Sequence, residues 1–150
     1  MKIKDLRLLY GVTSTLKLAK VDKDIATSII TNHIAAAKAV KEADADFEEA
    51  KKAIFKGLET KQNELAQLRE KYAAAKTDAE KAEILEKVGK YMDVINAEKT
   101  LMESYKNIQD KDVDVKLSMI ELDKYMEALA EAKIDYTAQD IENSQIIIKQ

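Results

Sequence analysis

The sequence predicts a mainly α-helical protein, and three observations carry this prediction. The 150 residues include no proline and only three glycines, so the chain is short of the residues that most readily form tight turns. Apolar residues recur at steps of three and four over long stretches, which is the spacing of one helix face. Two capping boxes, Thr77-Asp78-Ala79-Glu80 and Thr137-Ala138-Gln139-Asp140, mark helix starts. Hydrophobic residues at 46% and charged residues at 35% are typical of one globular domain.

The N-terminal half of the chain predicts a short helix followed by a much longer one. The first should run from Ile3 to Ala19, and Asp22 should cap the second. The apolar spine of the second helix alternates steps of three and four, a heptad pattern typical of helices that wrap around each other. The members of this spine are Ile29, His33, Ala36, Val40, Ala43, Phe47, Ala50, Ile54, Leu58, Leu65, Leu68 and Tyr72.

The capping box at Thr77 predicts a tight turn and a third helix that continues to Ile108. Such a turn folds the two long helices into an antiparallel, coiled-coil-like hairpin, in which the numbers of facing residues add to about 154. The expected apolar pairs are Leu68 with Leu85, Leu65 with Val88, Leu58 with Ile95, and Phe47 with Ile108. The same reasoning at the first turn places the first helix along the second, with His33 near Leu9.

After Asn107 the pattern changes and predicts a small α+β module. Residues 113–118 alternate apolar and charged side chains, as a half-exposed strand does, and residues 121–132 return to helical spacing. The β-branched run Ile146–Ile148 fits a strand paired with 113–118, or the end of a helix. We therefore expect a helical region over 1–109 and an acidic module over 110–150, with net charge −5, packed on it as a single domain.

The composition excludes several kinds of chemistry. Without cysteine there is no disulfide, thiolate nucleophile or iron–sulfur site. His33 is the only histidine and lacks the second ligand that a histidine metal site needs, so we interpret it as a packed polar group. The carboxylates between Glu42 and Glu49 divide between two helix faces, and no glycine-rich phosphate loop is present. We predict no catalytic, cofactor or metal site, and hence no enzyme.

The charges argue against nucleic acid as the partner. The chain has 23 lysines but only two arginines, Arg7 and Arg69, whereas arginine is the preferred residue for bidentate recognition of phosphates and bases. The most basic stripe, over residues 51–76, is interrupted by glutamates at spacings that allow pairing within the helix. Neither a signal peptide nor an apolar membrane span is apparent, so we expect the protein in the cytoplasm.

The segment IATSIITNHIAAAKAV, residues 25–40, is the candidate interface. It contains one charge, Lys38, and is apolar or small nearly all round, so it must be covered on more than one side. A protein partner or a second copy of the chain would provide such a cover, and so would the intramolecular core of a helical bundle. The candidate interface residues are Ile25, Ile29, Ile30, His33, Ala36, Ala37 and Val40.

Three parts of the chain together resemble a known group of proteins. They are the basic start MKIKDLRLLYGVTSTLKLAK, the Lys/Glu-rich hairpin, and the tail with DVDVKLSMIELDKY and YTAQDIENSQIII. In this order they resemble short, uncharacterised bacteriophage and prophage proteins with a helical hairpin and an acidic C-terminal tail. The resemblance implies a phage-encoded protein without known enzymatic activity, in the host cytoplasm or the virion, and it transfers no site residue.

We therefore predict a non-enzymatic protein-interaction protein, a structural or assembly component of a phage. Two alternatives stay open. One is a phage-encoded inhibitor or modulator of a host defence or regulatory protein. The other is an enzyme that binds a divalent metal or a nucleotide through its carboxylates.

Overall fold

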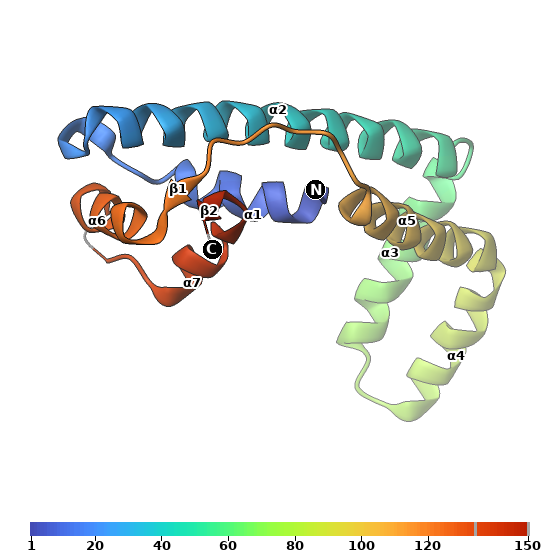
Figure 1. The fold of residues 1–150 in the computed structure, drawn as a ribbon. Helices are drawn as coiled ribbons and strands as arrows, with labels where there is room; N and C mark the ends of the chain where they lie inside the picture. Colours follow the sequence, from blue (N-terminus) through green and yellow to red (C-terminus); the bar gives the residue numbers. More distant parts are fainter. Residues whose placement is uncertain (134, 150) are drawn as a thin grey trace. The chain divides into compact units, whose positions relative to one another are not determined.

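The computed structural model describes residues 1–133 and 135–149, and it is mainly α-helical with a two-stranded sheet near the C-terminus, as the sequence predicts (Figure 1). The chain forms two compact units. Unit 1 comprises Met1–Ala45 and Ile108–Gln150, and unit 2 comprises Asp46–Asn107. The two ends of the chain share the core of unit 1.

Unit 1 is built from both ends of the chain. Its elements are α1 (Ile3–Thr13), the 3-10 turn η1 (Leu18–Lys20), the first part of α2 (Lys23–Ile54), β1 (Ile120–Glu121), α6 (Leu122–Ala132), α7 (Ala138–Glu142), the 3-10 turn η3 (Gln145–Ile147) and β2 (Ile148–Lys149). Its core brings together apolar side chains of α1, α2, α6 and η3, among them Leu6, Leu9, Ile29, Ala36, Leu129 and Ile147. Two expected caps are confirmed. Asp22 Oδ1 accepts from the backbone N–H groups of Asp24 and Ile25, and the capping box at Thr137 is formed.

Helix α1 ends earlier than the apolar spacing predicts, at Thr13 rather than Ala19. The hydroxyls of Thr13, Ser14 and Thr15 donate to the carbonyls of Leu9, Gly11 and Val12. Three consecutive hydroxyl side chains thus compete with the backbone for hydrogen bonds, which disfavours continuation of a helix. The chain turns there and resumes in η1.

The small sheet is present, but its pairing differs from the prediction. Strands β1 and β2 are parallel, with Ile120 opposite Ile148 and Glu121 opposite Lys149. Residues 113–118, the expected strand, are extended without joining this sheet. The backbone of this segment is held at its ends: the Val113 N–H donates to the Met1 carbonyl at 2.8 Å, and Ser118 binds the side chain of Asn32. Of the Ile146–Ile148 run, the first two residues lie in η3 and the third in β2.

Unit 2 contains three helices besides the end of α2. They are α3 (Glu59–Ala74), α4 (Asp78–Val88) and α5 (Met92–Asp110), which begins in unit 2 and ends in unit 1, with the 3-10 turn η2 (Gly89–Tyr91) between α4 and α5. The prediction of one continuous second helix is therefore wrong, because α2 ends at Ile54 and a separate helix, α3, begins at Glu59. Gly57, between them, has a φ of 79°, which breaks a right-handed helix. The capping box at Thr77 is confirmed.

Two polar pairs of unit 2 follow the hairpin register expected from a turn at Thr77, whereas the pair of Arg69 with Glu98 does not. Lys61 pairs with Asp93, and the Tyr91 hydroxyl donates to Glu64 at 2.9 Å, both within one residue of the predicted register. Individual apolar pairs differ. Leu85, expected to face Leu68, is 56% exposed, and Phe47 contacts the ring of Tyr105. The core of unit 2 consists of Phe55, Leu65, Val94 and Ala97 with half-buried neighbours that include Leu58, Val88 and Ile95.

Candidate functional site

The predicted interface residues divide between the core of unit 1 and its surface. Ile29, Ala36 and Val40 are buried in that core, and Ile25 is half-buried against it. For these four residues the structure shows the intramolecular packing that was the alternative interpretation of the segment. Ile30 is instead 48% exposed, and His33 and Ala37 are half-buried. These three candidates lie outside the core of unit 1.

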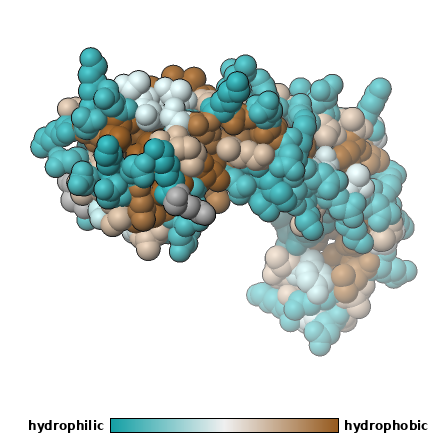
Figure 2. Space-filling view, viewed as in Figure 1, coloured by the Kyte–Doolittle hydropathy of each residue, from teal (hydrophilic) through white to brown (hydrophobic). Residues whose placement is uncertain are grey.

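The accessible candidates belong to a larger apolar surface, which we call the α2 stripe and define as Tyr10, Ile30, His33, Ile34 and Ala37. Ile34 is 62% exposed and Tyr10 is 36% exposed. Steps of four and three place Ile30, Ile34 and Ala37 on one face of α2. In the view of Figure 2, hydrophobic patches lie among hydrophilic side chains.

Sequence reasoning missed Ile34 and Tyr10. Ile34 lies off the heptad spine, so the spacing that predicts the buried face does not include it. A signal was nevertheless present, because Ile30 and Ile34 are four residues apart, and two isoleucines off the buried face predict a second apolar face. Tyr10 could not be assigned in this way, since its position beside α2 depends on how α1 packs.

Contacts of His33 fix one border of the α2 stripe. The Tyr10 and His33 rings are stacked, with centroids 5.1 Å apart. The Thr13 hydroxyl lies 2.9 Å from His33 Nδ1 and donates its single proton to the Leu9 carbonyl, also at 2.9 Å. This contact joins His33 to the last turn of α1. The His33 ring packs on Tyr10, and it belongs to no group of three or more potential metal ligands among the described residues.

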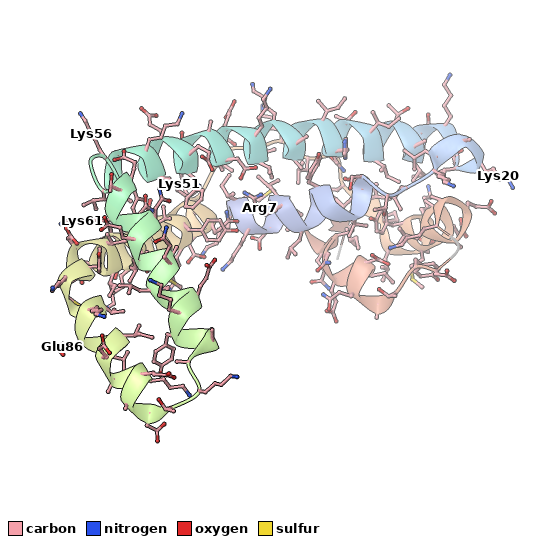
Figure 3. The ribbon with its side chains drawn as sticks, turned by 180° about the vertical axis from the view of Figure 1, so that it is seen from behind. Arg7, Lys20, Lys51, Lys56, Lys61 and Glu86 are labelled. Atoms are coloured by element: carbon pink, nitrogen blue, oxygen red, sulfur yellow. The ribbon has the colours of Figure 1, made fainter. Side chains whose placement is uncertain are left out.

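The α2 stripe is bordered by positive charge. Lys23, Lys38 and Lys41 are exposed, and none of them forms an ion pair with another described residue. The segment 25–41 has no carboxylate at all. The exposed carboxylates of Asp24 and Glu42 flank this segment. Beyond them, Asp44 accepts a hydrogen bond from the Arg7 guanidinium at 2.5 Å, and Figure 3 labels Arg7 on α1. The Asp44 carboxylate is thus already paired with α1.

Two further surface features lie in unit 1. Met119, Leu122 and Met126 form a second exposed apolar cluster. A cavity of about 680 Å³ lies between the start of α2 and α6. It has a mainly acidic rim over an apolar floor, with Val21, Asp22, Asp24, Ile25, Lys124, Glu127, Ala128, Ala130 and Glu131 as its lining.

The buried polar side chains of Tyr125 and Ser144 in unit 1 have partners and play structural roles. The Tyr125 hydroxyl donates to Ser144 Oγ at 2.7 Å, and Ser144 Oγ donates to the Asp140 carbonyl at 2.8 Å. Burial raises the pKa of Tyr125, which keeps its phenol protonated. The Lys133 ammonium donates to both carboxylate oxygens of Asp140 and holds the pKa of Asp140 below its usual range. These bonds fasten α7 to α6.

In unit 2 the basic stripe partly pairs with acidic side chains of α5. Lys61 binds Asp93, and Arg69 forms a bidentate pair with Glu98, with both distances at 2.7 Å. Lys51 and Lys56 extend from the end of α2 and the turn after it (Figure 3). Pairing of this kind supports a salt-bridged surface rather than a phosphate-binding groove.

Two further properties bear on function. Within the described ranges no group of three or more potential ligand side chains could hold a metal ion, and none of the helices there is apolar and long enough to cross a bilayer. Comparisons of the chain with protein-family models, curated proteins and solved structures found no match.

Proposed function

We propose that this protein acts by binding another protein through the α2 stripe, without catalysing a reaction. The observation that carries the proposal is the exposure of two isoleucines one helical turn apart, Ile30 at 48% and Ile34 at 62%. Completing the burial of each would contribute about 1–2 kcal/mol, so the stripe can form the centre of a contact.

The setting we propose is the assembly of a phage particle. It rests on the resemblance of the N-terminal segment, hairpin and acidic tail to phage and prophage proteins. A host defence or regulatory protein as the partner would use the same surface. The identity of the bound protein therefore distinguishes the two roles.

Photo-crosslinking at Ile34 tests the proposed surface. A photoreactive amino acid replaces Ile34 in one variant and Leu8 in another, because Leu8 is 49% exposed and lies on α1 outside the stripe. Both variants are expressed in cells that naturally produce the protein, and adducts are identified by mass spectrometry. We expect a discrete protein adduct at position 34 and none at position 8.

The outcomes of this experiment are distinct. A phage structural protein attached at position 34 supports assembly, and a host protein supports the modulator role. Absence of an adduct at position 34, or the same adducts at both positions, would contradict the α2 stripe as the contact surface.

A further inference from the structure

We propose that the partner segment seated on the α2 stripe is an amphipathic helix whose apolar face is bordered by carboxylates. This inference rests on the proposed function and specifies its partner. It follows from the shape of the stripe, the charge around it, and the poor fit of a second copy.

The shape of the α2 stripe suits a helix. Ile30, Ile34 and Ala37 follow one face of a straight helical segment, and Tyr10, stacked on His33, borders them from α1. From Lys23 to Lys41 this face is about 27 Å long at 1.5 Å per residue, the length of a partner helix of about 18 residues. An apolar helix face recognises such a surface through anchors at steps of three and four.

The positive charge around the α2 stripe indicates which side chains border the apolar face of the partner helix. Lys23 lies seven residues before Ile30, and Lys38 and Lys41 follow Ile34 and Ala37 by four, so all three lysines share the face of the isoleucines. They have no ion pair among the described residues. A partner with Glu or Asp beside its apolar anchors would pair with them, speeding association and fixing the register.

A second copy of the chain fits this surface poorly. Two α2 stripes facing each other would bring together two sets of Lys23, Lys38 and Lys41. Asp24 and Glu42 follow Lys23 and Lys41 by one residue each, and side chains one residue apart point to different faces of a helix. Asp44 is bound to Arg7. Juxtaposed like charges oppose such a dimer. The positive border thus favours a different, acidic partner.

Two synthetic helical peptides test this partner chemistry. They share one leucine stripe over about 20 residues and differ only in the bordering positions, which are glutamate in one peptide and lysine in the other. Binding to the full chain is measured by fluorescence anisotropy at low and high salt. We expect the acidic peptide to bind at least about tenfold more tightly than the basic one, and its affinity to fall as salt rises.

Variants of the protein locate the binding. Lys38→Glu/Lys41→Glu should reverse the preference between the peptides, and Ile34→Asp should remove binding of the acidic peptide. The matched control is Lys116→Glu/Lys124→Glu, which changes two exposed lysines of unit 1 outside the stripe and should keep the preference. Since Ile34 is 62% exposed, its variant should fold, and circular dichroism checks that it does.

The results that would overturn the proposal are specific. Equal binding of the two peptides, or no binding of either, would refute an acidic border. A concentration-dependent dimer in sedimentation that Ile34→Asp abolishes would show that a second copy covers the stripe. If neither peptide binds while photo-crosslinks at position 34 persist, the α2 stripe remains supported as a contact surface, and the proposal of an acidic partner helix is refuted. If both fail, the surface falls too.

Discussion

At the scale of single residues, Asn32 makes the most demanding polar contact in unit 1. It is fully buried, its Nδ2 donates to the Ser118 carbonyl at 2.8 Å, and its Oδ1 accepts from the Ser118 N–H at 2.7 Å. Asn32→Ala would leave both backbone groups without these partners. We expect it to lower the free energy of unfolding by about 2–4 kcal/mol, measured by urea denaturation with circular dichroism.

The control is Asn96→Ala, which removes an exposed amide from α5 and should change the free energy of unfolding by less than about 0.5 kcal/mol. Equal effects of the two substitutions would show that the Asn32 contact adds nothing to stability.

The role of Asn32 could not be predicted from the sequence, whereas the role of its neighbour could. His33 lies on the heptad spine, and its packing against α1 follows from that position. The partner of Asn32 lies 86 residues away, in a segment without regular structure. Local spacing holds no information on a contact of that kind. A polar side chain within an apolar segment shows only that some partner is required.

At the scale of elements, the turn between α2 and α3 depends on Gly57. Its φ of 79° is costly for any residue with a Cβ, although a Cβ there would meet no atom within 4 Å. Gly57→Ala should therefore destabilise unit 2 by about 1–2 kcal/mol through the backbone alone. The lower melting temperature in thermal denaturation measures the effect.

Gly89→Ala is the matched control, because its Cβ would also meet open space while its φ is not positive. This substitution should leave stability unchanged or raise it by up to about 1 kcal/mol. Destabilisation of equal size by both substitutions would contradict the backbone argument.

The interruption at Gly57 also shows why the prediction of one long helix was wrong. The heptad pattern continues through Leu58 and Leu65, and one glycine costs a helix only about 1 kcal/mol. Phe55, which lies off that spine, is nonetheless only 7% exposed in the core of unit 2. Burying a phenylalanine contributes about 1.5–3 kcal/mol, enough to favour a turn over continued helix. Capping boxes, in contrast, specify helix starts locally, and both were predicted correctly.

At the scale of the whole molecule, the closure of unit 1 by both ends of the chain was not predictable. The Met1 ammonium lies 3.3 Å from Asp112, and Lys4 binds Asp110 at 2.8 Å. Opposite charges at the ends are visible in the sequence, but exposed pairs contribute little and do not specify a partner. The apolar core shared by α1, α2 and η3 determines the arrangement, and its contacts span more than a hundred residues.

The two units should differ in local stability, because their cores differ. Helix α4 contains no buried residue, whereas α2 buries Ile29, Asn32, Ala36, Ala39, Val40 and Ala43 in unit 1. Helices with little tertiary burial open easily, since most helical stability in proteins comes from packing. Hydrogen exchange followed by mass spectrometry should therefore show fast exchange over 78–88 and the slowest exchange over 29–43.

Two matched capping variants test whether the local stability of α4 depends on its own N-cap. Thr77→Ala removes the N-cap of α4, which is worth about 1 kcal/mol, and should speed exchange over 78–88 about fivefold. Thr137→Ala removes the equivalent cap of α7 in unit 1 and should leave exchange over 78–88 unchanged. Protection of α4 equal to that of α2 would contradict the prediction. It would require a cover for Leu85 and Ile84 that the single chain does not supply, because Leu85 is 56% exposed.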